Sequence, residues 1–394
     1  FRDHLPRLRE MGVDILWLMP IFPVGEKNRK GTLGSYYAVR DYKAINPEFG
    51  TMDDFKELMK EAHAQGFKVI LDWVANHTSW DNQWIYDHPE WYTLDSLGKM
   101  VAPFDWTDVA DLNYDDAGLR DAMIDALKFW IHETDVDGYR CDVAGMVPID
   151  FWDRVRKELD SIKPVFMLAE AEQADLHFNA FDMTYAWELH HILNSIAQGK
   201  MNANAIDDYF QKMDTTYPVN AYRMNFITNH DENSWNGTVK ERMADASDVM
   251  AMLTYTLPGM PLLYSGQEVG LDKRLEFFEK DTIWWNTESP LLDFYTQMIA
   301  IKHKNEALWN GEFGSDYLNI PTDAEEQVLA FTRKKKDDMI IVLANLSDRA
   351  VAFNFTDRDY NKKYIDLLTG EKVNLKHRDP ITMEPWSYLI LGRN

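Results

Sequence analysis

The chain lacks several features that mark common classes of protein. It has one cysteine, Cys141, in 394 residues, so no disulfide can form within the chain and the redox compartment cannot be read from it. No apolar run approaches the roughly 18 residues of a membrane span, and no signal peptide is visible. Localisation stays open; because the chain begins at Phe1 without Met, a secreted, periplasmic or cell-surface protein is preferred to a cytoplasmic one. Basic residues are also scarce: 41 Lys and Arg against 65 Asp and Glu give a net charge of -24, which opposes binding to nucleic acid or anionic membrane.

A second absence concerns nucleotides, because no G-x-G-x-x-G turn follows an apolar run. Aromatic residues, in contrast, are abundant, with 14 Trp, 18 Tyr and 20 Phe. Several lie among polar residues, as in residues 79–84 and 105–107. Flat rings beside polar groups suit sugars, whose faces are apolar and whose edges carry hydroxyls, although any single ring is more simply explained as core. The composition therefore favours a neutral ligand.

Apolar strands alternate with helices along most of the chain. We expect strands at residues 13–19, 67–74, 138–143, 165–169, 181–185, 223–228 and 261–265. We expect helices between them at residues 52–65, 117–133, 149–162, 187–196 and 244–257. This alternation is typical of parallel strands covered by helices, and it predicts the α/β class with a (β/α)8 TIM barrel. Only seven strands are found, so we expect the first barrel strand to be encoded before Phe1, since its absence would leave two unpaired sheet edges.

Length and pattern together predict two domains. A single core stops growing near roughly 250 to 300 residues. We assign residues 1–311 to a catalytic barrel, with 78–114 as a short inserted loop domain, and residues 312–394 to an antiparallel β-sandwich domain. Short alternating strands support the second domain, at residues 328–334, 339–345, 350–355 and 387–391.

Four short stretches end apolar runs with residues suited to acid chemistry. They are residues 72–77, 140–142, 169–170 and 229–231. Three of them deliver carboxylates to strand ends, which is where a β/α barrel places its catalytic groups. An acid after an apolar run is more often a helix cap or a solvated turn residue, so each stretch alone is weak evidence. Their order and joint content carry the prediction.

The individual residues suggest roles. Arg140 and Asp142 lie two apart in a strand and point the same way, so the guanidinium would keep Asp142 ionised and nucleophilic; a plain ion pair is the alternative. Glu170 ends the next strand and is preferred as a general acid to Glu172, which already lies in the loop. Asp231 would be a third acid at the rim of the barrel.

Taken together, these stretches resemble the α-amylase family of glycoside hydrolases, and the resemblance extends over essentially the full length of the chain. Residues 72–77, 138–142, 169–170 and 226–231 are similar to that family's four conserved regions, in the same order. The resemblance implies that Asp142 is the nucleophile, Glu170 the acid/base and Asp231 the stabiliser of the transition state. It implies retaining hydrolysis of α-1,4-glucosidic bonds in starch, glycogen or maltodextrins, with the two reacting carboxyls roughly 5 to 5.5 Å apart.

The resemblance also implies residues that bind the substrate and a metal. Residues that would contact the sugar or the nucleophile are Tyr37, His77, Arg140 and His230. Many family members hold a structural calcium ion, and Asn76 and Asp111 match two of its oxygen ligands. The chain departs from the pattern at Gly145 and Met146, where many amylases have Lys-His.

Other functions remain open at this point. A transglycosidase, such as a glucanotransferase or branching enzyme, uses the same covalent intermediate, and sequence separates it poorly from a hydrolase. An amylase-like protein without catalysis, acting in interactions, is a further alternative that the three acids oppose. The expected partner is an α-glucan, bound by a monomer without a membrane span.

Overall fold

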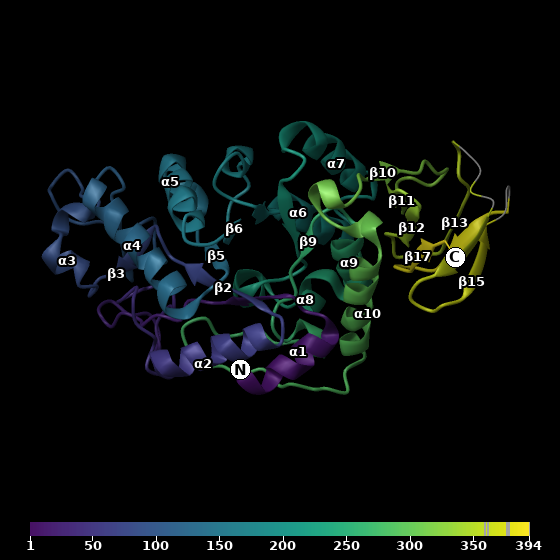
Figure 1. Cartoon of the computed structure of the whole chain (residues 1–394). Coiled ribbons are helices and arrows are strands. Elements are labelled where there is room, and N and C mark those ends of the chain that lie inside the picture. The colour runs from purple at the N-terminus through teal and green to yellow at the C-terminus, as the bar shows by residue number, and fades with distance from the viewer. Residues whose placement is uncertain (358–359, 361, 376–378, 394) are drawn as a thin grey trace. The chain divides into compact units, whose positions relative to one another are not determined.

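The structure is a computed structural model that describes residues 1–357, 360, 362–375 and 379–393 (Figure 1). The predicted C-terminal domain, 312–394, therefore includes residues 358–359, 361, 376–378 and 394, which lie outside the described residues. The chain divides into two compact units. The first comprises residues 1–185 and 276–281, and the second comprises residues 186–275 and 282–394.

The first unit is built on five parallel strands. In spatial order they are β1 (Ile15–Leu18), β2 (Lys68–Trp73), β5 (Gly138–Cys141), β6 (Phe166–Ala169) and β7 (Met183–Tyr185). All five strands were predicted to within a few residues. Because they are parallel and adjacent, their carboxyl ends meet at one edge of the sheet, and polar residues that follow neighbouring strands are brought together there.

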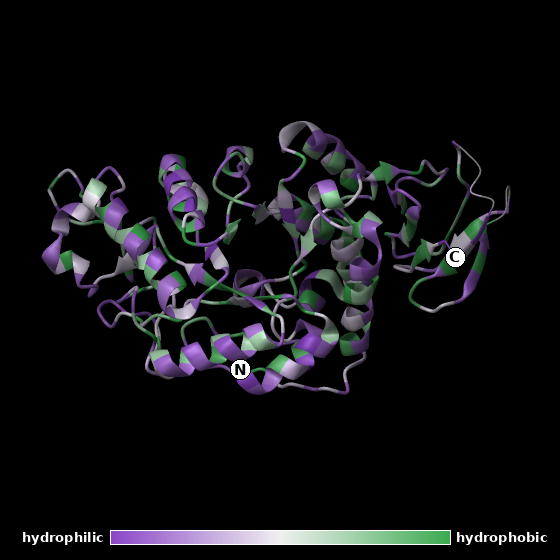
Figure 2. Ribbon diagram, viewed as in Figure 1, coloured by the Kyte–Doolittle hydropathy of each residue, from purple (hydrophilic) through white to green (hydrophobic). Residues whose placement is uncertain are grey.

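Amphipathic helices flank these strands in the sequence. They are α1 (Leu5–Met11), α2 (Met52–Ala64), α4 (Ala117–Thr134) and α5 (Ile149–Asp160). Thr51 and Asp54 form a reciprocal capping box at the start of α2, and the Asp116 side chain accepts two backbone N–H bonds at the start of α4. Figure 2 shows hydrophilic and hydrophobic residues side by side on α2 and α4, as expected for helices with one buried face.

Two long loops belong to the first unit. Residues 31–50, all of them described, form a long loop without helix or strand. The predicted inserted loop contains the antiparallel pair β3 (His77–Ser79) and β4 (Val109–Asp111) and the short helix α3 (Trp84–Asp87). The inserted segment is therefore tied back to the end of β2 by strand pairing.

The second unit begins with the helical part of the chain. Its helices are α6 (Trp187–Ala197), α7 (Asn204–Thr216), α8 (Val239–Met243), α9 (Ser247–Thr256) and α10 (Pro290–Lys304), and its parallel pair is β8 (Tyr222–Asn225) with β9 (Met260–Pro261). The strand predicted at 261–265 is shorter than expected, and a turn closed by the Gln267 N–H on the Tyr264 carbonyl oxygen lies within the predicted range. Helices α7, α8 and α10 were not predicted.

An antiparallel sheet completes the second unit. Its spatial order is β10 (Leu318–Asn319), β11 (Val328–Lys335), β12 (Asp338–Asn345), β17 (Tyr388–Gly392), β14 (Lys362–Asp366) and β15 (Lys372–Leu375). A second small pair joins β13 (Val351–Phe353) to β16 (Ile381–Met383). The strands predicted at 328–334 and 339–345 form a hairpin with a tight turn, because Lys335 pairs with Asp338 across two residues, the first of which, Lys336, has a φ of 53°.

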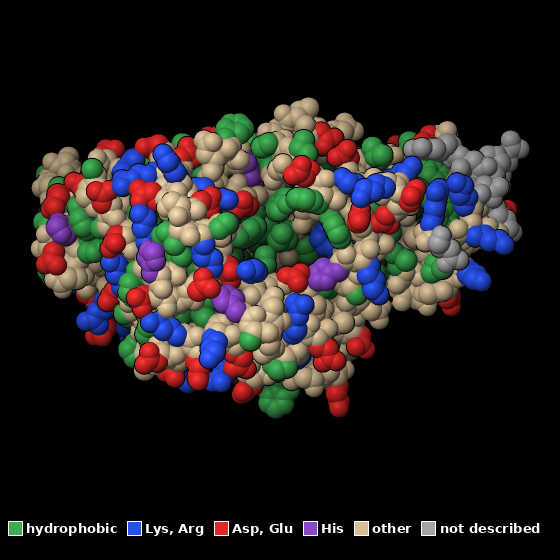
Figure 3. All heavy atoms as spheres, viewed as in Figure 1, with side chains coloured by type: hydrophobic (Ala, Val, Ile, Leu, Met, Phe, Trp, Pro, Cys, Tyr) green, Lys and Arg blue, Asp and Glu red, His purple; other side chains and the backbone are tan. Residues whose placement is uncertain are grey.

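The surface is mixed in character. On the face seen in Figure 3, acidic and basic side chains are interspersed with polar and apolar ones. Among the described helices, none combines the length and apolarity that crossing a bilayer requires.

Candidate active site

A single buried arginine organises the polar ends of three neighbouring strands. Arg140, in β5, has no solvent-exposed side-chain surface. Its Nη1 lies 3.0 Å from Asp72 Oδ1 and 2.9 Å from Asp142 Oδ1, while its Nη2 lies 2.9 Å from Glu170 Oε2. Asp72 belongs to β2, and Asp142 and Glu170 directly follow β5 and β6. The structure therefore brings the predicted nucleophile and the predicted acid/base onto the two terminal nitrogens of one guanidinium.

Strand pairing explains why these residues meet. Asp72 is the register partner of Arg140, and the Glu170 N–H donates to the Cys141 carbonyl oxygen at 3.0 Å, which extends the β5–β6 ladder by one residue. Side chains two apart in a strand share a face, so Arg140 and Asp142 point the same way. The alternating residues Tyr139 and Cys141 are fully buried. Burial raises the pKa of the Cys141 thiol, so this residue is an uncharged part of the core.

Asp72 is the buried partner that holds this guanidinium. Its Oδ2 accepts hydrogen bonds from Trp17 Nε1 at 3.0 Å and from the Tyr37 hydroxyl at 3.1 Å. Complete burial raises the pKa of Asp72 to about 6, although Arg140 acts in the opposite direction. Burial disfavours the charge of Arg140, but the carboxylates of Asp72 and Glu170 outweigh it and raise the arginine's pKa. Arg140 therefore stays charged at any working pH.

Glu170 is fixed by a second contact as well as by Arg140. The backbone N–H of Val143 donates to Glu170 Oε2 at 2.9 Å. Val143 has φ 37° and ψ 44°, a left-handed conformation that is an outlier for a β-branched residue. Strain of this kind costs on the order of 1–3 kcal/mol and persists only where the surroundings enforce it. Here it aims an N–H group at the predicted acid/base.

Aromatic rings surround the guanidinium. Its Cζ lies 5.1 Å from the ring centroid of Trp17, 5.8 Å from that of Tyr37 and 5.6 Å from that of Tyr185, whose hydroxyl accepts from Nε at 3.0 Å. Cation–π contacts of this kind are stronger when they are desolvated. The rings exclude water from Arg140 and hold its plane, which fixes where the carboxylates lie.

Residues 276–281 reach the same unit from a distant part of the sequence. Phe277 lies nearly parallel to Tyr37, with ring centroids 6.2 Å apart and an interplanar angle of 15°. The Leu33 N–H donates to the Phe278 carbonyl oxygen at 3.1 Å, and the Thr32 N–H donates to Glu279 Oε1 at 2.9 Å. This segment therefore supports the predicted substrate-binding tyrosine.

His77 lies in the same unit but makes different contacts. It is buried, with Nδ1 3.3 Å from Asn76 Nδ2, and its ring is 5.5 Å from that of Trp106. Burial lowers the pKa of His77 to about 4, and a hydrogen bond to the Tyr37 backbone opposes this only in part. The ring is therefore neutral at neutral pH, which suits a hydrogen-bonding role toward a sugar hydroxyl.

The predicted calcium ligands lie where β3 meets β4. Asp111 is the register partner of His77, and the Leu112 N–H donates to the Asn76 carbonyl oxygen. Amide and carboxylate oxygens are of the kind that calcium takes, but calcium needs about six to eight oxygens. In the described part of the chain, no group of three or more His, Cys, Asp or Glu side chains is placed to hold a metal. An ion here would depend on backbone carbonyl oxygens and water for its other ligands.

Asp231 and His230 belong to the second unit. His230 Nε2 lies 3.2 Å from Asp231 Oδ2; the His230 side chain is buried, whereas the Asp231 side chain is one-third exposed. Glu232, the next residue, is buried within 3.0 Å of His190 Nε2. Burial acts to raise the pKa of Glu232, but His190, Asn236 and Arg242 outweigh it and lower that pKa to about 2. Of the adjacent acids, Asp231 thus faces solvent and Glu232 stabilises the turn.

The departure at Gly145 has a local explanation. A Cβ on Gly145 would lie 2.5 Å from Nε2 of Gln173. Any larger side chain at position 145 would therefore require Gln173 to move. The Lys-His pair of many amylases is replaced here by a glycine that a glutamine covers.

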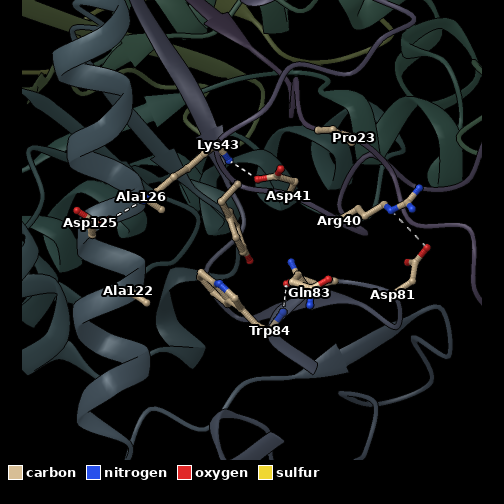
Figure 4. Close-up of a pocket in the computed structure, with 12 residues that line it drawn as sticks. Pro23, Arg40, Asp41, Lys43, Asp81, Gln83, Trp84, Ala122, Asp125 and Ala126 are labelled. Atoms are coloured by element: carbon tan, nitrogen blue, oxygen red, sulfur yellow. Dashed lines mark hydrogen bonds and ion pairs between the residues drawn. The ribbon is translucent and has the colours of Figure 1, made fainter. Parts of the chain in front are cut away.

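A separate pocket of about 560 Å³ lies elsewhere in the first unit (Figure 4). Two ion pairs line it, with Lys43 Nζ 2.5 Å from Asp125 Oδ2 and Arg40 Nε 3.8 Å from Asp81 Oδ2. None of the predicted site residues lines it. The strand-end carboxylates remain the candidate active site.

Comparison with known proteins agrees with this geometry. The model of the α-amylase catalytic domain matches residues 1–96 and 86–288, and the model of the maltogenic amylase C-terminal domain matches residues 320–390. The chain belongs to the α-amylase family. It is therefore an α-amylase-family glycoside hydrolase, and the predicted fold class, with a C-terminal antiparallel domain, is confirmed. The predicted domain limits stay predictions.

Individual relatives support the α-amylase family assignment. An α-amylase from Lactobacillus plantarum has 32% sequence identity and a TM-score of 0.88, with 100% of this chain and 94% of that chain covered. The maltogenic α-amylase AmyB from Thermotoga neapolitana has 30% identity and a TM-score of 0.88, with 100% and 93% covered. The α-amylase MalA of Haloarcula japonica is 28% identical over 87% of this chain. The matched region spans only 51% of the length of MalA.

Sequence reasoning missed part of this α-amylase-family site. Asp72 was recognised within its motif but was given no role, and Trp17, Tyr185 and Phe277 were not singled out. A signal existed for three of them, since Asp72, Trp17 and Tyr185 lie in or near the last residues of parallel strands. Phe277 lies in a loop, and its contact with Tyr37 has no local signal in the sequence.

Proposed function

We propose that this protein hydrolyses α-1,4-glucosidic bonds in starch, glycogen or maltodextrins, with retention of anomeric configuration. The observation that carries the proposal is the binding of Asp142 and Glu170 to one buried guanidinium at the ends of adjacent parallel strands. Retaining glycosidases use two neighbouring carboxyls, one to attack the sugar and one to transfer protons. Matched relatives described as α-amylases, a maltogenic amylase and a cyclomaltodextrinase point the same way.

The proposed reaction has two steps. Glu170 donates its proton to the glycosidic oxygen while a carboxylate oxygen of Asp142 attacks the anomeric carbon, so the C–O bond to the leaving sugar breaks and a glucosyl ester forms. Glu170, now ionised, takes a proton from water, whose oxygen attacks the same carbon and returns Asp142 to its free form. Two inversions leave the α-anomer. Asp231 would bind sugar hydroxyls and stabilise the positive charge that develops on the ring.

Retention is tested by the anomer that is released first. Proton NMR of maltoheptaose hydrolysis is expected to show the α-anomeric signal of the new reducing end before mutarotation produces the β-anomer. A β-anomer appearing first would rule out the covalent route. Resolving the products from soluble starch, maltotriose, pullulan and cyclodextrin would then establish chain-length preference and the tolerance of α-1,6 bonds.

The same experiment separates hydrolysis from transglycosylation. A glucanotransferase or branching enzyme would pass the glucosyl group to a sugar hydroxyl, so products longer than the substrate would dominate. We expect shorter products to dominate at low substrate concentration.

We further propose that the protein is a monomer, for which light scattering coupled to size exclusion would give a mass near 46.1 kDa for this chain.

We also propose that calcium, held by Asn76 and Asp111, is a structural ligand and takes no part in the bond-breaking steps. An ion that binds only the folded state stabilises it by about 2.7 kcal/mol when present at 100 times its Kd. Adding calcium to chelator-treated protein is therefore expected to raise Tm by several degrees, and Asp111→Asn should remove most of that rise. Asp115→Asn, a change of the same kind at a nearby exposed residue, is the control. An identical Tm with and without calcium would remove the metal from the account.

A further inference from the structure

Trp235 stands out among the aromatic residues of the second unit. It belongs to the π-helical turn Glu232–Asn236, which begins directly after Asp231, and 54% of its surface is exposed. Large aromatic side chains normally contribute most of their area to a core or an interface. An exposed tryptophan one turn from a predicted catalytic acid is therefore a candidate for contact with the substrate.

The turn that carries Trp235 is fixed from its buried side. The Glu232 N–H donates to Asn229 Oδ1 at 2.8 Å, and Glu232 Oε1 accepts from Asn236 Nδ2 at 2.8 Å. Glu232 Oε2 lies 3.0 Å from His190 Nε2. A buried, hydrogen-bonded carboxylate of this kind is costly to displace, so the backbone of the turn is held in one conformation.

The turn is also fixed by the segment that runs beside it. Asn233 Nδ2 donates to the Lys273 carbonyl oxygen at 3.0 Å, and the Leu275 N–H donates to Asn233 Oδ1 at 2.8 Å. Ser234 Oγ donates to the Leu275 carbonyl oxygen at 2.8 Å. The side chains of residues 232, 233, 234 and 236 thus all bind protein groups on the inner side of the turn, and Trp235 is the large hydrophobic residue of the turn that is exposed.

The spacing of Asp231 and Trp235 matters for recognition. In a π-helical turn hydrogen bonds join residues five apart, so residues four apart lie close to the same side of it. A carboxylate accepts hydrogen bonds from sugar hydroxyls, and an indole face covers the apolar face of a sugar ring. The pair therefore offers the two kinds of contact that successive units of a glucan present.

We propose that Trp235 is a specificity-determining residue whose indole stacks on a glucose unit adjacent to the one that Asp231 contacts. Its effect is to favour glucans over substrates with a single glucosyl group. This inference rests on the proposed glucan hydrolysis. A tryptophan on a fixed backbone has few side-chain torsions to immobilise, so stacking on it loses little conformational freedom.

The test compares a glucan with a substrate that occupies one sugar subsite. The ratio of kcat/KM for maltotriose to kcat/KM for α-glucosyl fluoride is measured in the wild type and in Trp235→Ala. Loss of one aromatic stacking contact is expected to lower that ratio by about tenfold. Trp235→Phe, which retains a smaller ring, should keep most of the wild-type ratio, which separates stacking from a purely structural effect.

A matched control and a binding measurement complete the experiment. Trp309 is 39% exposed and follows the short turn Glu306–Leu308, outside the turn that carries Asp231, so Trp309→Ala should keep the wild-type ratio. In an Asp142→Asn background, calorimetry should show a Kd for maltoheptaose about tenfold higher with Trp235→Ala. A ratio and a Kd within twofold of their references would overturn the proposal for Trp235. Wild-type protein that hydrolyses neither substrate would instead refute the proposed function itself.

Discussion

Replacing Asp142 with asparagine is expected to lower kcat for maltodextrin hydrolysis by about four to six orders of magnitude, the range seen when an enzyme loses its nucleophile. The amide is nearly the same size as the carboxylate, so it can occupy the same space beside Arg140. It is a poor nucleophile toward the anomeric carbon and cannot form the glucosyl ester. Initial rates on maltoheptaose measure the loss, and circular dichroism with thermal unfolding establishes that the variant is folded.

Asp137, at the other end of β5, provides a matched control for Asp142. It precedes β5, whereas Asp142 follows it, and its carboxylate accepts the Val69 N–H at 2.9 Å and lies 2.7 Å from His63 Nε2. Asp137→Asn should lower Tm while leaving kcat within a few-fold of the wild-type value. A folded Asp142→Asn variant with substantial turnover would disprove the assignment of the nucleophile. Azide provides a positive test: with Asp142→Ala and α-glucosyl fluoride it should restore turnover and give glucosyl azide of inverted configuration.

Replacing Arg140 with methionine is expected to lower the stability of the folded protein strongly, in addition to its activity. The change leaves Asp72, Asp142 and Glu170 without the cation that they share. Removing one partner of a buried ion pair typically costs about 3–5 kcal/mol, because a charge remains buried without compensation. Urea unfolding of the two proteins measures the difference. Arg154→Met is the control, since Arg154 makes exposed pairs with Asp121 and Glu158 that contribute about 0–1 kcal/mol.

The loss of folding stability in Arg140→Met is expected to depend on pH in a definite direction. Asp72 has a folded-state pKa raised to about 6, so the folded protein binds more protons than the unfolded chain between roughly pH 4 and 6. The stability contribution of Asp72 therefore falls as pH rises through that window. Without Arg140 the ionised form of Asp72 is still less favourable, so the deficit of Arg140→Met should be larger at pH 7.5 than at pH 5. An equal deficit at both values would show that the arginine acts through packing alone. Asp72→Asn in the same background should recover part of the stability.

Local sequence signals predicted that several of the candidate residues lie close together. Asp142 and Glu170 follow apolar strands, and a parallel sheet brings such positions together whatever the intervening loops do. Arg140 was found for a similar reason, because alternation along a strand fixes which way its side chain points. The role of Asp72 was missed because the partners that define it, Trp17 and Tyr37, are 55 and 35 residues away in sequence.

Other parts could not be read from local pattern. Phe277 approaches Tyr37 only because residues 276–281 fold against the loop that contains Thr32 and Leu33, a contact that joins positions almost 250 apart in sequence. Helix α10 did carry a signal, since Ser289 caps it and Pro290 occupies its first turn. Helix α7 carries acidic residues and buries only Ile206, Tyr209 and Phe210, so its apolar stripe is short.

The left-handed backbone at Val143 sets a limit on how this enzyme could be made more robust. A glycine there would adopt the same torsion angles at little cost, and a screen for heat resistance would tend to select it. With the more flexible glycine, the backbone N–H that donates to Glu170 would also point in other directions. Thermal stability and turnover thus place opposite demands on the peptide unit of residue 143. Substitutions that raise thermal stability are better sought away from the strand ends.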